Sequence, residues 1–183
     1  MSDVQSRGDS KLTLRPLLSE DRFEAIAAHG ELLLEDFHFL LDFDPENDWD
    51  QYLQNLDEQS LGTNLMQGQV PATFLVAVIG SRISARVSIR HCLNEYLNGT
   101  GGGHIGYAVR PEFRRQGIAT DVLKRSLNIA AELGISRALL TCDAENISSR
   151  RVIEKNGGIF ENSAIHNRDG RLKHRFWIET VQD

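Results

Sequence analysis

The stretch HIGYAVRPEFRRQGIAT, residues 104–120, decides the fold of this chain. It joins a β-prone strand over 104–109, a turn that opens with Arg110-Pro111, and a helix that begins near Gly117. The first N–H groups of a helix have no intrahelical acceptor, and the aligned peptide dipoles place roughly half a positive charge at that end. A glycine at this junction lets an anion approach the backbone, so the segment predicts a phosphate-binding turn.

Cationic side chains around this turn favour a polyphosphate. They are Arg110, Arg114, Arg115, Lys124 and Arg125. A Walker A loop is excluded, because no Gly-Lys-Ser/Thr follows the glycine. Residues 101–106 satisfy Gly-x-Gly-x-x-Gly, but they precede a strand instead of joining a strand to a helix. This order disfavours a Rossmann dinucleotide site, and we interpret the glycines as a mobile loop beside the active site.

Outward from this turn, hydrophobic periodicity predicts helices and strands in alternation. The expected elements are an extended opening over 12–17, a helix over 19–37, a helix over 48–61, a hairpin of strands 74–79 and 83–90, a helix over 117–134, a strand over 138–142, a helix over 148–156, and a closing hairpin of 159–165 and 172–180. In the second strand of this hairpin, Ile83, Ala85, Val87 and Ile89 alternate with polar residues, which is typical of a β-strand. This order predicts a mixed α/β sheet.

Composition predicts a single domain over residues 1–183, since 40% of the chain is hydrophobic. No signal peptide is evident, and no apolar run reaches the roughly 20 residues of a membrane span. Cys92 and Cys142 lie far apart without metal-ligand spacing, so neither a disulfide framework nor a metal site is expected. These features predict a soluble, cytoplasmic protein. Nucleic acid is not an expected partner, because no compact basic cluster with interleaved aromatic residues occurs.

Charge is distributed unevenly along the chain. Between Phe23 and Ser81 there are 11 Asp or Glu and no Lys or Arg, whereas residues 82–183 hold 16 Lys or Arg against 11 Asp or Glu. The acidic half favours a cationic ligand and the other half an anionic one. An ordinary solvated acidic helical surface is an equally weighted alternative.

Two motifs resemble those of the GNAT superfamily of acetyltransferases. Arg114-Arg-Gln-Gly-Ile-Ala119 matches its R/Q-x-x-G-x-G/A loop, and Leu139 to Ser149, followed by Glu154-Lys-Asn-Gly157, is similar to its next strand, Asn-x-x-Ser and helix. Within the superfamily, SIRHCLNEYL (88–97) followed by GGHIGYAVRP (102–111) is most similar to a branch of predicted bacterial acetyltransferases. The resemblance implies a mixed, mostly antiparallel twisted sheet of about seven strands, with helices on both faces and a splayed central strand pair.

The resemblance also implies how acetyl-CoA would bind. The backbone of Ala108 and Val109 would pair with the pantetheine arm, and the Val109 N–H would bind the thioester carbonyl. Asn146 and Ser149 would contact the arm from the other side. The residues expected at the pyrophosphate are Arg114, Arg115, Gln116, Gly117, Ile118, Ala119 and Thr120.

The implied reaction is direct acetyl transfer to a primary amine in a ternary complex. Many family members have a tyrosine on the helix after Asn-x-x-Ser that protonates the departing sulfur, but Ile153 stands at the matching position here. Water, Tyr96 or Tyr107 would replace it, or the thiolate would leave unassisted. For the general base, Glu95 is the first choice, with His91 and His104 as alternatives; each is also consistent with an ordinary surface or strand-end residue.

The acceptor side in this family is built largely by the first two helices, where the eleven carboxylates lie. We therefore expect a cationic small-molecule or peptide amine as acceptor. A homodimer through the C-terminal hairpin is a further expectation. The competing functions are a non-catalytic acyl-CoA-binding module, which Ile153 favours, and a peptide-binding scaffold that uses the acidic helices.

Overall fold

The computed structural model describes residues 11–180. Its strands are β1 (Thr13–Arg15), β2 (Ala72–Ile79), β3 (Arg82–Arg90), β4 (Ile105–Val109), β5 (Arg137–Asp143), β6 (Ile159–Ile165) and β7 (Leu172–Glu179). Its helices are α1 (Arg22–Leu33), α2 (Trp49–Leu61), α3 (Glu95–Gly99), α4 (Ile118–Glu132) and α5 (Ile147–Lys155), with 3-10 turns η1 (Ser19–Asp21) and η2 (Pro111–Phe113).

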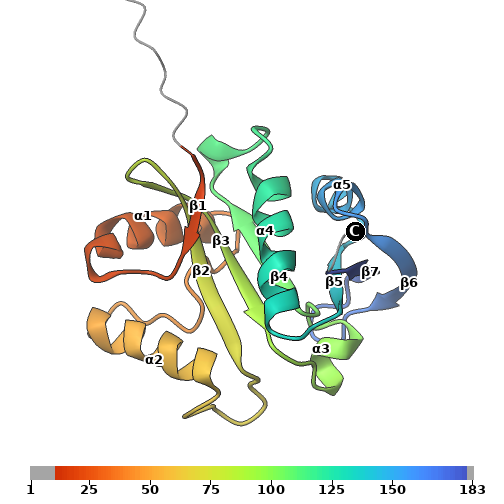
Figure 1. The fold of residues 1–183 in the computed structure, drawn as a ribbon, viewed down its shortest axis with the longest axis horizontal. Helices are drawn as coiled ribbons and strands as arrows, with labels where there is room; N and C mark the ends of the chain where they lie inside the picture. The colour runs from red at the N-terminus through yellow and green to blue at the C-terminus, as the bar shows by residue number, and fades with distance from the viewer. Residues whose placement is uncertain (1–10, 181–183) are drawn as a thin grey trace, which may run out of the picture.

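The strands form two antiparallel sheets, ordered β1-β2-β3-β4 and β5-β7-β6. The sheets meet where Gly103 bridges Leu140 and the His104 N–H donates to the Leu139 carbonyl at 2.7 Å. From this junction β4 and β5 run into separate sheets (Figure 1). The α/β class, the seven strands and the splayed central pair are therefore confirmed, with the strands divided between two sheets.

Helices cover both faces of the four-stranded sheet (Figure 1). Along β2, Phe74 and Val76 pack into the core beneath α1 and α2, whereas Leu75 and Ala77 pack into the core beneath α4. This alternation follows from the two-residue period of a strand. Because both faces are buried, β2 is apolar along almost its whole length, as the sequence FLVAVI indicated.

A β-bulge in β3 changes the face of one residue. Ala77 pairs with Ala85 and Val78 with Ile83, so Ser84 is an extra residue between them. Ile83 consequently packs with the α1 and α2 core, while Ala85 packs with the α4 core. The predicted hairpin is present, but the bulge interrupts its alternation at Ser84 and turns Ile83 to the other face of the sheet. The Ser84 carbonyl accepts from the Arg110 N–H at 3.0 Å.

Two local predictions also differ from the structure. The first long helix ends at Leu33 instead of Phe37, and Asp36 adopts a left-handed conformation at φ 57°. Within the expected glycine-rich loop region a short helix, α3, begins at Glu95. Asn94 caps it, with its side-chain oxygen accepting from the Leu97 N–H at 2.9 Å. Asparagine before such a turn is a capping signal, which the short length of the helix concealed.

Candidate functional site

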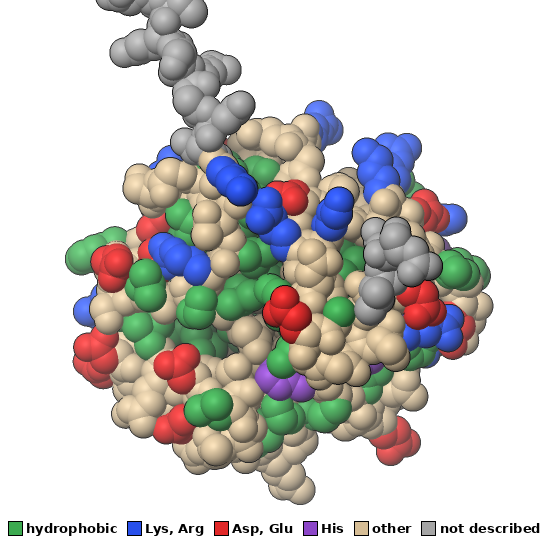
Figure 2. All heavy atoms as spheres, viewed as in Figure 1, with side chains coloured by type: hydrophobic (Ala, Val, Ile, Leu, Met, Phe, Trp, Pro, Cys, Tyr) green, Lys and Arg blue, Asp and Glu red, His purple; other side chains and the backbone are tan. Residues whose placement is uncertain are grey.

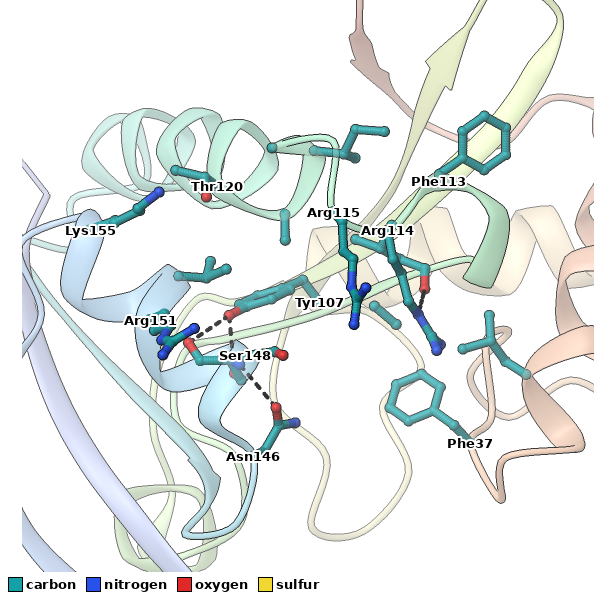
Figure 3. A pocket seen from close by; sticks show the side chains of 18 of the residues that line it. Phe37, Tyr107, Phe113, Arg114, Arg115, Thr120, Asn146, Ser148, Arg151 and Lys155 are labelled. Atoms are coloured by element: carbon teal, nitrogen blue, oxygen red, sulfur yellow. Dashed lines mark hydrogen bonds between the residues drawn. The ribbon is translucent and has the colours of Figure 1, made fainter.

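A cleft of about 770 Å³ opens where the end of α1, strand β4 and the first turns of α4 and α5 come together (Figure 3). Its lining residues are Leu32, Glu35, Phe37, Tyr107, Ala108, Val109, Phe113, Arg114, Arg115, Gly117, Ile118, Ala119, Thr120, Asn146, Ser148, Ser149, Arg151, Val152 and Lys155. Its size is ample for a cofactor-sized ligand.

The cleft gathers most of the residues that the sequence predicts to bind the cofactor. Those that line it are Ala108, Val109, Arg114, Arg115, Gly117, Ile118, Ala119, Thr120, Asn146 and Ser149. Gln116 lies outside the lining, and its side-chain amide donates to the Glu112 carbonyl at 2.9 Å. The assignment of these residues to acetyl-CoA remains a prediction, but two motifs almost thirty residues apart in sequence share one cavity.

The N-terminus of α4 presents free backbone donors to the cleft. Gly117 is its N-cap, with φ 81° and no side-chain capping bond. The first intrahelical bond joins the Asp121 N–H to the Gly117 carbonyl at 3.1 Å, so the preceding N–H groups of the first turn have no helical acceptor. A Cβ built on Gly117 meets nothing within 4 Å, because that side faces open space. The arrangement fits an anion.

Cations from the turn before α4 and from α5 surround these donors. Arg115, Arg151 and Lys155 line the cleft, and none of them pairs with a carboxylate within residues 11–180. Figure 3 shows Arg151 and Lys155 on α5 and Arg115 on the opposite wall. Figure 2 shows Lys and Arg side chains gathered along the upper edge of the molecule. Sequence reasoning missed Arg151 and Lys155, although their i, i+4 spacing puts them on one helical face.

Other cations named from the sequence have partners instead. Arg114 pairs with Glu35 at 2.9 and 2.6 Å, and Arg125 pairs with Asp121 at 3.0 Å. Arg110 is buried with 1% of its surface exposed, and two carboxylates of α1 hold it. The expectation that Arg110 adds charge to the phosphate turn was therefore wrong, because its guanidinium is neutralised inside the protein.

Strand β4 presents an unpaired backbone edge to the cleft. The Arg110 N–H donates to Ser84 on β3, and the His104 carbonyl accepts from the Arg90 N–H at 2.8 Å. Even-numbered residues of this strand therefore direct their backbone groups toward β3. Because successive amides of a strand point to opposite edges, the Val109 N–H points away from β3, into the gap between the sheets.

Tyr107 reaches from β4 across the cleft to α5. Its hydroxyl lies 3.0 Å from the Ser149 Oγ and donates to the Ser149 carbonyl at 3.4 Å (Figure 3). Asn146 caps α5 by accepting from the Ser149 N–H at 2.9 Å, which fixes that turn. Burial raises the pKa of Tyr107 to about 12, so the phenol keeps its proton at neutral pH. Ile153 is buried beneath the same helix, at 1% exposure.

The remaining predicted catalytic residues lie outside the cleft lining. Glu95 is exposed at the start of α3. His104 is buried at the sheet junction, where its Nδ1 accepts from the Leu139 N–H at 2.9 Å and burial lowers its pKa. His91 bonds Thr73 at 2.8 Å, and Tyr96 bonds His166 at 3.1 Å. The structure does not bring these groups together, so their roles stay predictions.

Two features are absent from residues 11–180. No helix in this part of the chain has the length and apolarity to cross a bilayer. Over the same residues, no three His, Cys, Asp or Glu side chains are grouped so as to hold a metal ion.

Several solved structures share this fold. RimJ from Mycobacterium smegmatis, solved with CoA-disulfide, superposes with a TM-score of 0.68 at 17% identity over 92% of this chain and 81% of its own. Ribosomal-protein-S5-alanine acetyltransferase from Vibrio fischeri gives 0.67 at 18% over 93% and 94%. The putative acetyltransferase yncA from Salmonella typhimurium, solved with acetyl-CoA, gives 0.61 at 15% over 94% and 95%.

Sequence comparison agrees with the structural likeness. No curated protein sequence matches this chain with significance. The family model described as an acetyltransferase (GNAT) domain, however, matches residues 11–159, which include the cleft and both motifs. This chain belongs to the GNAT acetyltransferase family.

Proposed function

We propose that this protein is an acyl-CoA-dependent N-acetyltransferase that moves the acetyl group of acetyl-CoA directly to a primary amine. One observation carries the proposal: the free amides at the start of α4 and the unpaired edge of β4 line the same cleft. An anion-binding helix terminus beside an open strand edge suits a ligand with a diphosphate and an extended amide-containing arm. The structures of yncA with acetyl-CoA and of RimJ with CoA-disulfide support this ligand.

The residues present fit acetyl-CoA, which supplies an activated thioester when bound. The amides of Gly117 to Thr120, with Arg115, Arg151 and Lys155, would hold the diphosphate. The β4 edge at Ala108 and Val109 would hold the arm, with Asn146 and Ser149 facing it from α5. Each group offers hydrogen-bond donors or positive charge where the ligand has acceptors or negative charge.

The Val109 N–H is proposed to stabilise charge during transfer. It points into the gap between the sheets and donates to the thioester carbonyl oxygen, where negative charge develops as the amine attacks. A preorganised backbone donor of this kind is worth about 2.7–4 kcal/mol in other acyl-transfer enzymes. Its position depends on the β3–β4 ladder, which holds Val109 opposite Ala85.

Few side chains near the cleft could act as the general base or the general acid. Among the described residues that line the cleft, the only carboxylate is Glu35, and its ion pair with Arg114 lowers its pKa and makes it a weak base. Tyr107 carries a proton at neutral pH and is the proposed donor to the departing sulfur. Glu95 and His104 stay proposed bases, although they lie outside the lining. We therefore expect water to carry the amine's proton out of the cleft.

Replacing Tyr107 with phenylalanine is expected to lower kcat about 30-fold. General acids typically contribute a hundredfold or more, but the ordinary thiol pKa near 8.5 lessens the need for one here. The acetyl-CoA KM should stay within about threefold, since the ring is retained. Initial rates of thiol release measure both constants. An unchanged kcat would remove Tyr107 from the mechanism and leave the thiolate to depart unassisted.

The acceptor is proposed to be a small-molecule or peptide amine, cationic before it loses its proton. The acidic helices support this proposal only in part. Three of their carboxylates near the cleft, Glu24, Glu31 and Glu35, are already paired with arginines. If the acidic stretch between Phe23 and Ser81 attracts a cationic acceptor, it therefore does so through its other Asp and Glu side chains.

Location and assembly are proposed from weaker observations. A cytoplasmic location accords with the cysteine usage, because Cys92 and Cys142 are both free thiols. A homodimer through the β6–β7 hairpin is supported by edge strand β6, whose Ile159, Phe160 and Ile165 are exposed. Exposed apolar edges of this kind favour association.

Thiol release from acetyl-CoA in the presence of an amine panel tests the proposed function. Turnover of at least one primary amine, with the N-acetyl product identified by mass, is the expected result. The competing non-catalytic module predicts acetyl-CoA binding without turnover of any amine. Thermal shift separates the two from a scaffold, because acetyl-CoA at 100 times its Kd should stabilise a binding protein by about 2.7 kcal/mol. A scaffold predicts no such shift.

A further inference from the structure

Strand β3 carries two arginines, Arg86 and Arg90, that no carboxylate in the described part of the chain neutralises. Arg86 is buried at 6% exposure, and Arg90 is half-buried on the same face of the strand. Neither forms an ion pair with any residue between 11 and 180. Arg110, one strand away, shows the contrast, since two glutamates of α1 bind its guanidinium.

The hydrogen bonds of Arg86 leave it poorly satisfied. Its Nη1 donates to the Gly106 carbonyl at 3.5 Å and its Nη2 to the His38 carbonyl at 3.4 Å, both long contacts. Its Nε is buried without a hydrogen-bond partner in the described part of the chain. A buried guanidinium with weak partners is costly, and burial lowers the pKa of Arg86 to about 10. Such a group is suited to receiving an anion.

Arg86 lies next to the cofactor cleft. It is paired in the ladder with Ala108, which lines the cleft, and its guanidinium carbon lies 4.9 Å from the centroid of the Phe37 ring. Phe37 also lines the cleft, and Figure 3 shows its ring facing that space. A single aromatic ring and the backbone of β4 therefore separate Arg86 from the place where the acetyl group is transferred.

Arg90 lies beyond Arg86 on the same face of β3 and contacts the glycine-rich loop at residues 101–103. Its Nη1 donates to the Gly103 carbonyl at 3.2 Å. A Cβ built on Gly102 would lie 3.6 Å from this guanidinium, and one built on Gly106 would lie 3.7 Å from it. The segments that cover Arg90 thus present backbone without side chains at Gly102 and Gly106, and a methyl group at either position would be in van der Waals contact with the guanidinium.

We propose that the acceptor amine also carries a carboxylate, which Arg86 binds with Arg90 alongside. The acceptor would then be an amino acid-like molecule whose amine faces Val109 while its carboxylate lies on the β3 face. This proposal rests on the proposed function and narrows its substrate class. The planar guanidinium binds a carboxylate through two parallel hydrogen bonds, which fixes the orientation of the molecule. Arg86 is in this view a specificity-determining residue.

The segment over Arg86 makes the proposal physically accessible. Residues 34–48 form neither helix nor strand, and Asp36, next to Phe37, has a left-handed backbone at φ 57°. Phe37 is partly exposed and packs at the edge of the core beneath α1 and α2, where its ring also makes the cation–π contact with Arg86. A carboxylate would replace that contact with a stronger one.

The test compares matched acceptors. The panel holds amino acids with the amine one to four carbons from the carboxylate, the corresponding carboxamides, and diamines. The best acceptor is expected to be an amino acid, favoured over its carboxamide about 100-fold in kcat/KM, because the amide leaves Arg86 unpaired. Arg86→Met should remove most of this ratio through KM, and Arg86→Lys should restore part of it. Arg137→Met, at an exposed site on β5, is the control.

A structural role for Arg86 gives a different pattern. If Arg86 only held residues 34–48 through the His38 carbonyl, Arg86→Met would lower activity on amino acids and carboxamides equally, and the proposal would be overturned. A diamine or carboxamide as the best acceptor would overturn it as well. Acetyl-CoA affinity and melting temperature of each variant show whether the fold is retained.

A second measurement needs no turnover. CoA-saturated protein is titrated in a calorimeter with N-acetyl amino acids and with their carboxamides. If the protein binds the N-acetyl amino acids more tightly than their carboxamides, and Arg86→Met loses this preference, the carboxylate site is supported. This holds even if no amine is turned over, because the absence of turnover would contradict only the proposed catalysis. If the protein binds acetyl-CoA but binds the N-acetyl amino acids and their carboxamides equally well, or binds neither, the proposed carboxylate site is overturned.

Discussion

Replacing Gly117 with glutamate is expected to weaken acetyl-CoA binding about 1000-fold, the order of magnitude lost when a buried charged contact is broken and a like charge is introduced. Gly117 stands at the N-cap of α4 with its α-carbon facing the open cleft. A carboxylate there would occupy the anion position and oppose the diphosphate. Isothermal titration calorimetry of wild type and variant measures the change directly.

The control for this variant is Gly134→Glu. Gly134 follows the same helix at its opposite end, has the same φ of 81°, and likewise has nothing within 4 Å of a built Cβ. The left-handed strain, about 1–2 kcal/mol for a residue with a side chain, is therefore matched. Gly134→Glu should leave acetyl-CoA affinity unchanged. If Gly117→Glu binds acetyl-CoA as the wild type does, the helix terminus is not the diphosphate site.

Arg110→Met is expected to lower the free energy of unfolding by about 3 kcal/mol. This value is at the low end of the losses found when a buried ion pair is broken, because the two glutamates that bind Arg110 are partly exposed to solvent. Arg110 binds Glu31 through two contacts at 2.9 and 2.6 Å, Glu24 at 2.6 Å and the Ile83 carbonyl at 2.8 Å. The substitution leaves Glu31 without its cation, while Glu24 keeps its ion pair with Arg82 at 2.7 Å. For a chain of this size the melting temperature should fall by about 6–12 °C.

Arg137→Met provides the comparison. Its ion pair with Glu179 lies at the surface, with both side chains more than half exposed, and such pairs contribute about 0–1 kcal/mol. Denaturant unfolding of the two variants gives both values. A loss below 1 kcal/mol in Arg110→Met would show that its ion pairs do little more than offset the cost of burying them.

The fold could be predicted from the sequence largely because two short motifs determine local backbone conformation. Gly117 marks a left-handed N-cap and Asn146 a helix cap, and both local conformations depend on residue type more than on distant contacts. Hydrophobic periodicity then placed the remaining helices and strands. The strand-to-helix order between them left few alternative topologies.

The sequence could not show which charges pair, because pairing depends on tertiary distance. Arg110 and Arg86 look alike in the sequence, yet one meets two glutamates of α1 and the other meets none within the described residues. Phe37 was assigned to a helix, and only the left-handed turn at Asp36 brings it to the cleft. The bulge at Ser84 likewise arises from pairing between strands and has no local signal.

The junction at Gly103 determines how widely the two sheets diverge. A Cβ at this residue would lie 2.2 Å from the Leu139 carbonyl oxygen, so main chain touches main chain at the vertex. The closest approach of the two sheets at this point is thus mainly a backbone contact, to which side chains farther along the cleft walls do not contribute. Side chains along the cleft walls can consequently diversify during evolution, altering which amines are accepted, while the separation that receives the acyl donor stays constant.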